Sequence, residues 1–312
     1  AVPTFEYTVD AATLCLTLIP APVTLEYTHG TAMIGSLVTI EKRIPEYAAT
    51  EGADETWETL PIEQLSSELE RYCGVTVRTR RVRAATGEDD ASANAAEDAR
   101  DARAGAPAAM NGTVISLGLD SRLAHDEYTL DVFASDTIAV RGGGESGLRY
   151  GLQTLRQIIG QTSRAIPCLH IQDKPAFAVR AYSLDVTRGR VPTMEFLTWF
   201  VDQLALYKYN QFQLYVEHAF AFVELSEAWR GTDPLTAADI TYLDEYCARR
   251  GIELVPSLAT FGHMYMNLRT REHRGLGEFP EDADRPFSFI ERMEHHTLNA
   301  ADPKAHDFAS RL

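Results

Sequence analysis

The sequence predicts an α/β protein with two domains, a small α+β domain followed by the first βα units of an eightfold barrel. In the second half of the chain, apolar β-prone runs alternate with helical patterns, which is typical of successive βα units. The first half instead has short strand-like runs with brief connections. The length of 312 residues also favours two domains. We place them at residues 1–172 and 173–312.

The first domain is expected to contain several short strands and two helices. We expect strands at 13–20, 36–40, 75–79, 112–118, 128–133 and 137–140. A helix is expected over 61–73, with Ile62, Leu65, Leu69 and Tyr72 on one apolar face, and a second over 146–159. Residues 84–111 are rich in Ala, Asp, Glu, Asn and Gly, and such a composition predicts a surface loop inside the domain.

A glycine-rich segment precedes the second helix. Gly142, Gly144 and Gly147 match the GxGxxG spacing of dinucleotide-binding loops. The strands before it have brief connections, which suggests antiparallel pairing, Pro167 interrupts the segment after the helix, and no acidic residue follows at the expected distance. We therefore expect a tight strand–helix turn, with nucleotide binding as the weaker alternative.

The second domain is expected to begin a barrel. Strands are predicted at 179–186, 211–217 and 252–257, with helices over 192–207 and 236–250 and a further helix beginning at Asp302. Loops are expected at 219–234 and 258–296. Residues 176–312 are about half of the roughly 250 residues of a full barrel. We therefore expect the chain to be a truncated portion of a longer protein.

Composition and charge narrow the classes of partner. The net charge of −16 disfavours nucleic acids and anionic membranes, whereas a neutral sugar needs no electrostatic steering. No apolar run reaches the roughly 18–20 residues of a membrane span. We expect a cytoplasmic protein, or a secreted one if a signal was removed, since the chain opens on Ala1. The cysteines show no metal-ligand spacing and predict buried or partly buried thiols, without a metal or cofactor: Cys15, Cys73, Cys168 and Cys247.

Polar residues follow each strand of the expected barrel. Arg188 follows the first strand, Glu217 and His218 end the second, and His263 lies just beyond the third. Active groups of barrel enzymes lie at the carboxyl ends of the strands, so these side chains are expected to converge on one pocket. Each could instead be a solvated or structural residue. We interpret His295 and His296 as solvated loop groups.

The residues carry a resemblance to a known family. The segments are Leu18-Ile-Pro-Ala-Pro, Glu127-Tyr-Thr-Leu-Asp-Val, Gly147-Leu-Arg-Tyr-Gly-Leu-Gln-Thr-Leu-Arg-Gln, Ile171-Gln-Asp-Lys-Pro-Ala-Phe-Ala-Val-Arg and Leu184-Asp-Val-Thr-Arg188. Together they resemble the glycoside hydrolase family 20 β-N-acetylhexosaminidases, over the N-terminal domain and the first half of the catalytic barrel. The resemblance implies a retaining, exo-acting hydrolase that removes terminal β-linked N-acetylhexosamine from a glycan by substrate-assisted catalysis.

The resemblance also implies a role for each candidate residue. Arg188 matches the arginine that binds hydroxyls of the terminal sugar, and Glu217 and His263 match an Asp and a His that support the general acid. His218 replaces the second Asp of the family's Asp-Asp pair and is a substrate-binding candidate. Phe261 stands where the family has Pro, and Ser257 where an acidic residue is common. These departures indicate a divergent branch with an open linkage preference.

The family's adjacent Asp-Glu pair, which orients the acetamido group and protonates the leaving oxygen, has no match here. The adjacent Asp-Glu pairs of the sequence lie elsewhere, at 54–55, 126–127 and 244–245. We therefore expect the isolated chain to be inactive. The alternatives are a non-catalytic carbohydrate-binding protein and a related hydrolase that uses the same acetamido mechanism on protein-linked sugar. The oligomeric state is left open.

Overall fold

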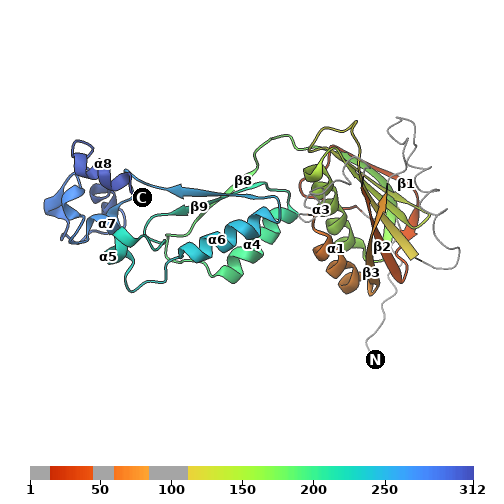
Figure 1. The fold of residues 1–312 in the computed structure, drawn as a ribbon, viewed down its shortest axis with the longest axis horizontal. Coiled ribbons are helices and arrows are strands. Elements are labelled where there is room, and N and C mark those ends of the chain that lie inside the picture. Colours follow the sequence, from red (N-terminus) through yellow and green to blue (C-terminus); the bar gives the residue numbers. More distant parts are fainter. Residues whose placement is uncertain (1–14, 45–59, 84–111) are drawn as a thin grey trace, which may run out of the picture. The chain divides into compact units, whose positions relative to one another are not determined.

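The computed structural model describes residues 15–44, 60–83 and 112–312, which form two compact units (Figure 1). The first unit runs to Ala178 and also includes Ala205–Lys208 and Arg249–Gly251. The second consists of Val179–Leu204, Tyr209–Ala248 and Ile252–Leu312. Among the helices of these described residues, we find none with the length and apolar character that crossing a membrane requires.

The first unit is built on a seven-stranded mixed sheet with the order β1-β7-β5-β6-β4-β2-β3. Its strands are β1 (Thr24–Met33), β2 (Leu37–Ile44), β3 (Thr76–Arg83), β4 (Gly112–Leu119), β5 (Tyr128–Phe133), β6 (Thr137–Gly142) and β7 (Ala165–Asp173). The antiparallel pairing expected for β6 holds on its β5 side and is wrong on its β4 side, where the strands are parallel. A brief connection fixes only the pairing of strands that follow each other in the chain.

Helices cover one face of this sheet (Figure 1). They are α1 (Ile62–Glu68), the π-helical turn η3 (Leu69–Cys73) and the long α3 (Glu145–Thr162). Leu148, Leu152, Leu155 and Ile159 make a buried apolar face on α3, and Ile62, Leu65 and Leu69 are buried as expected. Tyr72 is 42% exposed, contrary to expectation, and Cys73 is buried in its place. The widened π turn shifts the last residues away from the α-helical spacing on which the prediction rested.

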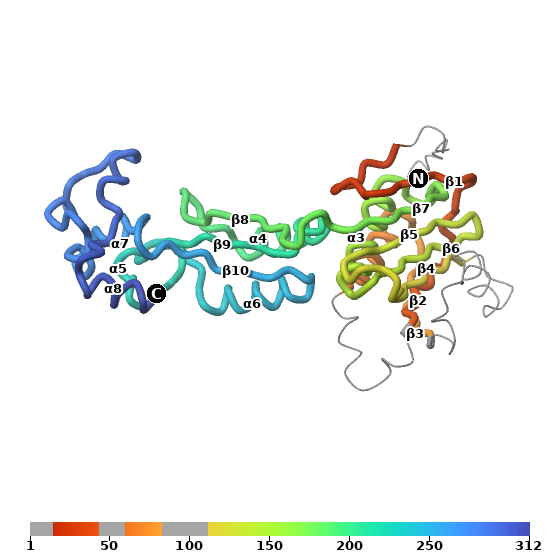
Figure 2. Tube along the Cα trace, turned by 90° about the horizontal axis from the view of Figure 1, so that it is seen from above, coloured from red at the N-terminus to blue at the C-terminus, as the bar shows by residue number. Residues whose placement is uncertain are grey.

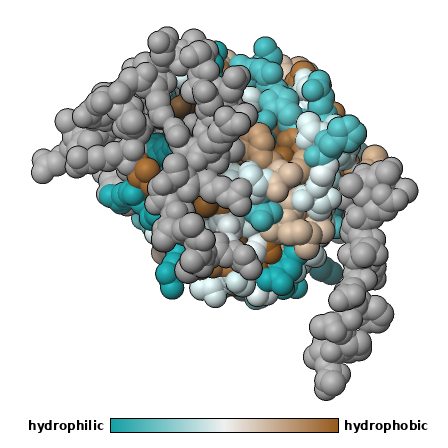
Figure 3. Space-filling model, turned by 90° about the vertical axis from the view of Figure 1, so that its right-hand side faces the viewer, coloured by the Kyte–Doolittle hydropathy of each residue, from teal (hydrophilic) through white to brown (hydrophobic). Residues whose placement is uncertain are grey.

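The burial pattern of the strands shows which face meets the helices. Along β5, Tyr128, Leu130 and Val132 are buried, and the residues between them are half-buried. This period of two is the one expected for a sheet with only one closely packed face. Figure 3 views the first unit from the other side of the sheet, where hydrophobic and hydrophilic residues are mixed.

The glycine-rich segment forms the expected tight turn between β6 and α3. A Cβ on Gly143 would lie 1.9 Å from the carbonyl oxygen of Ala124, and one on Gly147 would lie 2.3 Å from that of Glu127. The backbone N–H of Gly143 donates to the Glu127 oxygen at 2.9 Å. Close backbone approach therefore accounts for these glycines, and no nucleotide needs to be invoked.

Two features of the first unit differ from the predicted elements. Residues 15–18 form no strand, although Leu16 and Leu18 are buried, and residues 13 and 14 lie outside the described residues. Pro167 does not interrupt its segment, which is strand β7. Pro167 pairs only with Thr31 of β1, because β7 pairs with β5 from Leu169 onward, so its missing N–H is not required there.

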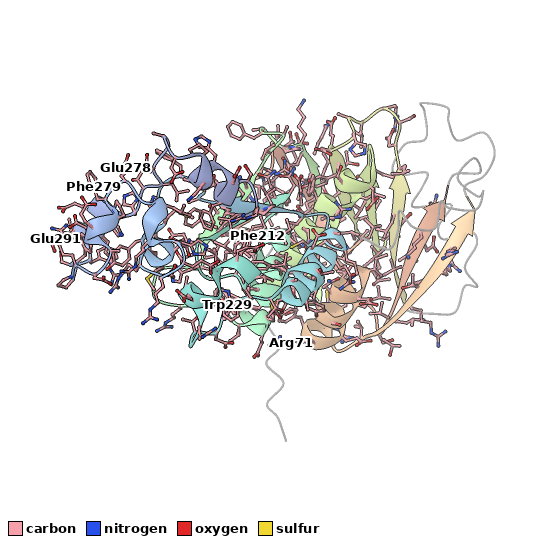
Figure 4. All side chains as sticks on the ribbon, turned by 60° about the vertical axis from the view of Figure 1, so that its left-hand side comes forward. Arg71, Phe212, Trp229, Glu278, Phe279 and Glu291 are labelled. Carbon is pink, nitrogen blue, oxygen red and sulfur yellow. The ribbon has the colours of Figure 1, made fainter. Side chains whose placement is uncertain are left out.

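The second unit begins with three parallel strands, separated by helices, in the sheet order β10-β9-β8 (Figure 2). The strands are β8 (Ala181–Asp185), β9 (Gln211–Val216) and β10 (Glu253–Leu258), and α4 (Met194–Leu206) and α6 (Ala237–Ala248) are the intervening helices. These elements agree with the predicted barrel strands and helices to within a few residues. Phe212 of β9 is fully buried and packs 5.8 Å from the ring of Phe200 on α4 (Figure 4).

The two predicted loops of this unit contain short helices. Between β9 and α6 lie η4 (Val223–Leu225) and α5 (Ser226–Trp229). After β10 come α7 (Tyr265–Leu268), η5 (Arg274–Leu276), η6 (Pro280–Asp282), η7 (Glu291–His295) and α8 (Pro303–Ala309). A small core holds this cluster together, made of Leu225, Ala228, Met264, Leu268, Leu298, Ala305 and Phe308.

The cysteines at 15, 73, 168 and 247 form no disulfide with one another. The predicted surface loop at 84–111 lies outside the described residues. Cys73, Cys168 and Cys247 are buried as expected, but Cys15 is exposed. Cys15 precedes buried Leu16 in an irregular segment, where a side chain next to a buried one is free to face water.

Candidate active site

Parallel pairing brings the ends of the three strands of the second unit into register. Asp185 at the end of β8 is paired with Tyr215 of β9, which in turn is paired with Ser257 of β10. The residues that follow therefore leave the sheet at a common edge. Arg188, Glu217 and His263 all lie there, as the sequence predicts.

Glu217 is the centre of this cluster. It is buried, and its Oε1 accepts a hydrogen bond from the Arg188 guanidinium at 2.7 Å and another from the Tyr215 hydroxyl at 2.9 Å. The Nδ1 atom of His263 lies 3.4 Å from the same oxygen. A buried carboxylate with these partners satisfies the rule that charges inside a protein are paired.

Arg188 contacts most of the cluster. Besides Glu217, its guanidinium donates to Thr187 Oγ1 and lies 3.2 Å from His263 Nδ1 and 3.6 Å from Asp185 Oδ2. Burial alone would lower the pKa of Arg188, but the hydrogen bond to Glu217 and the Glu217 charge raise it above its usual value. The hydrogen bonds named above use its two terminal nitrogens, and the side chain is 42% exposed. Arg188 therefore keeps a donor for a ligand.

His263 is held in an unusual backbone conformation. Its φ of 59° lies in the left-handed region, which non-glycine residues seldom occupy. The backbone N–H of His263 donates to Nδ1 of His296 at 2.8 Å, and Met264 N–H donates to the carbonyl oxygen of His296 at 2.9 Å. His296 thus fixes the turn that directs His263 toward Glu217, and its proton is on Nε2, because Nδ1 accepts.

His218 lies at the edge of the cluster. Its Nδ1 atom is 4.0 Å from Glu217 Oε2, beyond hydrogen-bond distance, and this buried nitrogen has no partner among the described residues. Burial lowers the pKa of the His218 imidazole, and the Glu217 charge opposes this only in part. His218 is therefore a neutral group with an unused nitrogen beside the carboxylate.

Two members of the cluster are absent from the sequence prediction. Tyr215 stands two residues before Glu217 on the same strand, so the period of two could have placed it on the same face. Burial, followed by the Glu217 hydrogen bond and charge, raises the pKa of Tyr215 to about 12. The interpretation of His295 as solvated is wrong, since it is 2% exposed. His296 is half-buried, and it binds the turn of His263. No local pattern predicts that contact.

Similarity to known proteins identifies the family. The model of "Glycosyl hydrolase family 20, domain 2" matches residues 16–174, and that of "Glycosyl hydrolase family 20, catalytic domain" matches residues 177–312. The chain belongs to glycosyl hydrolase family 20. Its curated relatives include a beta-hexosaminidase from Akkermansia muciniphila, 30% identical over 166 residues, and a beta-N-acetylhexosaminidase from Cellulomonas fimi, 28% identical over 193 residues.

The solved structures of this family share the fold. The N-acetyl-beta-hexosaminidase of Streptomyces plicatus matches 99% of this family 20 chain with a TM-score of 0.65 at 19% identity. The Streptomyces coelicolor beta-N-acetylhexosaminidase matches 94% with a TM-score of 0.65 at 20% identity. The matches span only 57% and 56% of those chains, and 32% and 38% of the two curated relatives.

Proposed function

We propose that this family 20 chain supplies the sugar-binding part of a β-N-acetylhexosaminidase. The enzyme would be retaining and exo-acting, and it would remove terminal β-linked N-acetylhexosamine from a glycan by substrate-assisted catalysis. The observation that carries the proposal is the Arg188–Glu217–His263 cluster at the carboxyl ends of three consecutive parallel strands. The match of the family's catalytic domain to residues 177–312 supports it.

Each residue has a role that its contacts support. Arg188 would bind hydroxyls of the terminal sugar, since it is partly exposed and retains an N–H donor. Glu217 would fix Arg188 and, together with His263, support the general acid electrostatically. His218 would contact the substrate, because its buried nitrogen is unpaired among the described residues and adjoins Glu217.

The direct catalytic pair would not come from the adjacent Asp-Glu residues of this chain. Asp126 and Glu127 precede β5 in the first unit, Asp244 and Glu245 lie within α6, and residues 54–55 lie outside the described residues. The reaction needs one carboxylate to orient the acetamido group, whose oxygen attacks the anomeric carbon, and an acid to protonate the leaving oxygen. We therefore propose that the isolated chain binds sugar without turning it over.

Hydrolysis of an aryl N-acetyl-β-glucosaminide tests this function. The assay compares the 312-residue chain with the full gene product that contains it. We expect turnover by the gene product alone, and an Arg188→Ala change in it should lower kcat/KM about 10- to 100-fold, the usual effect of losing a charged hydrogen bond. Arg190→Ala, an exposed arginine two residues on, is the matched control.

The outcomes separate the alternatives. Turnover by this chain after repeated purification would overturn the assignment of the missing carboxylates. Absence of turnover in both proteins, with sugar binding retained, would favour a non-catalytic carbohydrate-binding protein. Activity on glycosylated proteins and none on free glycosides would favour the related acetamido-mechanism hydrolase.

A further inference from the structure

A second polar hollow lies in the second unit, outside the Arg188 cluster. Its volume is about 460 Å³, within the roughly 300–1,000 Å³ of small-molecule sites. The walls come from α5 with the residue after it, and from α7 with the turn that follows. Trp229, which Figure 4 labels, is the last residue of α5. The charged lining residues are Glu227, Arg230, Arg269, Arg271 and Arg274.

The charge of this hollow is opposite to that of the chain. Four arginines and one glutamate line it, in a protein whose net charge is −16, and one further carboxylate, that of Asp284, pairs with Arg274. Cations gathered in one place repel each other, although water weakens this repulsion between exposed side chains. The arrangement is therefore favourable when an anion occupies the hollow.

The arginines are only partly neutralised by the protein. Arg274 forms two hydrogen bonds to Asp284, at 2.8 and 2.9 Å, while its buried Nε has no partner among the described residues. Arg269 lies over the ring of Tyr265 at 5.2 Å. The side chains of Arg230 and Arg271 make no hydrogen bond or ion pair within the described ranges. Three arginine charges without an ion pair among the described residues, and one buried donor of Arg274, thus remain for a ligand.

The walls of the hollow are fixed by hydrogen bonds. The backbone N–H of Arg271 donates to Glu227 Oε2 at 2.8 Å, which ties the two walls together. Thr270 is buried, and its hydroxyl donates to the carbonyl oxygen of Asn267 at 2.7 Å and accepts from the backbone N–H of His273 at 3.2 Å. A site whose backbone is held in advance loses less entropy when it binds.

We propose that this hollow binds an oxyanion, a sulfate, phosphate or carboxylate group, carried on a saccharide. Guanidinium groups pair with such anions through two parallel hydrogen bonds. The assignment of the saccharide rests on the proposed function. The helices that line the hollow follow the strands of the proposed sugar site, since α5 follows β9, which leads into Glu217, and α7 follows β10, which leads into His263. The anion site itself does not depend on that function.

A thermal unfolding series tests the anion site. The midpoint of the 312-residue chain is measured in sulfate, in phosphate and in chloride at equal ionic strength. We expect sulfate and phosphate to raise it relative to chloride in the wild type, and this difference to shrink in Arg230→Gln/Arg271→Gln to the general stabilisation that these excluded salts give any folded protein. Arg164→Gln/Arg311→Gln, which removes two exposed arginines outside the hollow, should behave as wild type. Arg230→Lys should keep part of the response.

Either of two results overturns the anion site: a wild type that does not distinguish sulfate from chloride, or a pocket variant that keeps the full difference.

Calorimetric titration then tests the saccharide with sulfated N-acetylglucosamine, the neutral sugar and inorganic sulfate. We expect the sulfated sugar to bind at least about tenfold more tightly than inorganic sulfate, through the pocket arginines. Equal affinities would overturn the saccharide assignment. If the hydrolase proposal is wrong, the chain should still respond to inorganic sulfate. Failure of the proposed function can therefore be distinguished from failure of the anion site.

Discussion

Glu217 sets the chemistry of its neighbours because three of them approach the same oxygen. Arg188 and Tyr215 donate to Oε1, and His263 lies 3.4 Å from it. One negative charge therefore holds an arginine in place, favours the neutral form of a tyrosine and orients a histidine. A substitution at Glu217 should therefore affect all three of these side chains.

The titration of Tyr215 measures this coupling. Burial comes first among the causes that raise its pKa to about 12, followed by the hydrogen bond to Glu217 and the Glu217 charge. In Glu217→Gln, the charge is removed and the burial remains, so the pKa should fall below 12 and stay above 10. Carbon NMR of labelled tyrosine, assigned with Tyr215→Phe, gives the value. An unchanged pKa would contradict the coupling.

The raised pKa has a consequence for stability at alkaline pH. The folded state keeps the Tyr215 proton up to about pH 12, whereas the unfolded chain loses it near pH 10. Stabilisation by this group is therefore complete below pH 10 and is lost as the pH rises toward 12. We expect wild type to lose more stability than Tyr215→Phe over that interval in urea unfolding. Parallel curves would argue against the shift.

The sequence places the four candidate residues because each follows a strand-like run, and parallel strands end at one edge. It cannot predict His296, whose contact with the backbone of His263 spans 33 positions. It also cannot predict the positive φ of His263, since that conformation is imposed by the surrounding turn rather than by local propensity.

At the scale of elements, tight backbone contacts position α3 at the end of β6. A Cβ on Gly147 would meet the Glu127 oxygen at 2.3 Å, whereas one on Gly160 of the same helix meets nothing within 4 Å. Gly147→Ala should destabilise the first unit by about 1–3 kcal/mol through steric strain.

The matched variant should have the opposite effect. Gly160→Ala replaces a glycine inside a helix at an open position and should stabilise by up to about 1 kcal/mol. Urea unfolding, followed by circular dichroism, measures both. Equal effects of the two substitutions would contradict the close approach at Gly147.

A buried polar network joins elements of the first unit. Lys208 Nζ lies 3.1 Å from Asp173 Oδ2 and donates to the Tyr128 hydroxyl at 2.8 Å, and that hydroxyl also binds Asp173 at 3.0 Å. Burial, and then the Asp173 charge, raises the pKa of Tyr128, so the phenol stays neutral. The network pairs the opposite charges of Lys208 and Asp173, and burying either charge without its partner would be costly in free energy.

Removal of one partner should be strongly destabilising. Lys208→Ala leaves Asp173 buried without its cation and should cost about 3–5 kcal/mol of unfolding free energy. Lys174→Ala, at an exposed lysine beside Asp173, should change it by less than about 0.5 kcal/mol. The double variant Lys208→Ala/Asp173→Ala should cost less than the sum of the single changes. Strict additivity would show that the pair is not coupled.

Elements with a clear apolar period are predictable, and elements held by distant partners are not. Residues 15–18 look like a strand, yet the backbone of Thr17 and Ile19 is bound by the side chains of Gln161 and Gln157 instead of by a neighbouring strand. Strand β1 escapes prediction because most of its residues are exposed and carry no buried alternation. Pairing with β7 and the burial of Ala32 hold it in place.

At the scale of the whole molecule, the sequence predicts the fold class because α/β alternation requires parallel strands joined by crossover helices. The three parallel strands with α4 and α6, and the mixed sheet before them, bear this out. The arginine-lined hollow is not predictable in the same way, since Arg230 and Arg271 come together only when α5 packs near α7.

The central claim is that Arg188, held by Glu217, is the sugar-binding group of this family 20 chain. Calorimetric titration of N-acetylglucosamine into the 312-residue chain tests it without requiring turnover. Wild type and Arg190→Ala are expected to bind the sugar, and Arg188→Ala is expected to bind it at least about tenfold more weakly. Equal affinity of Arg188→Ala and wild type would contradict the claim, as would a wild type that binds no sugar.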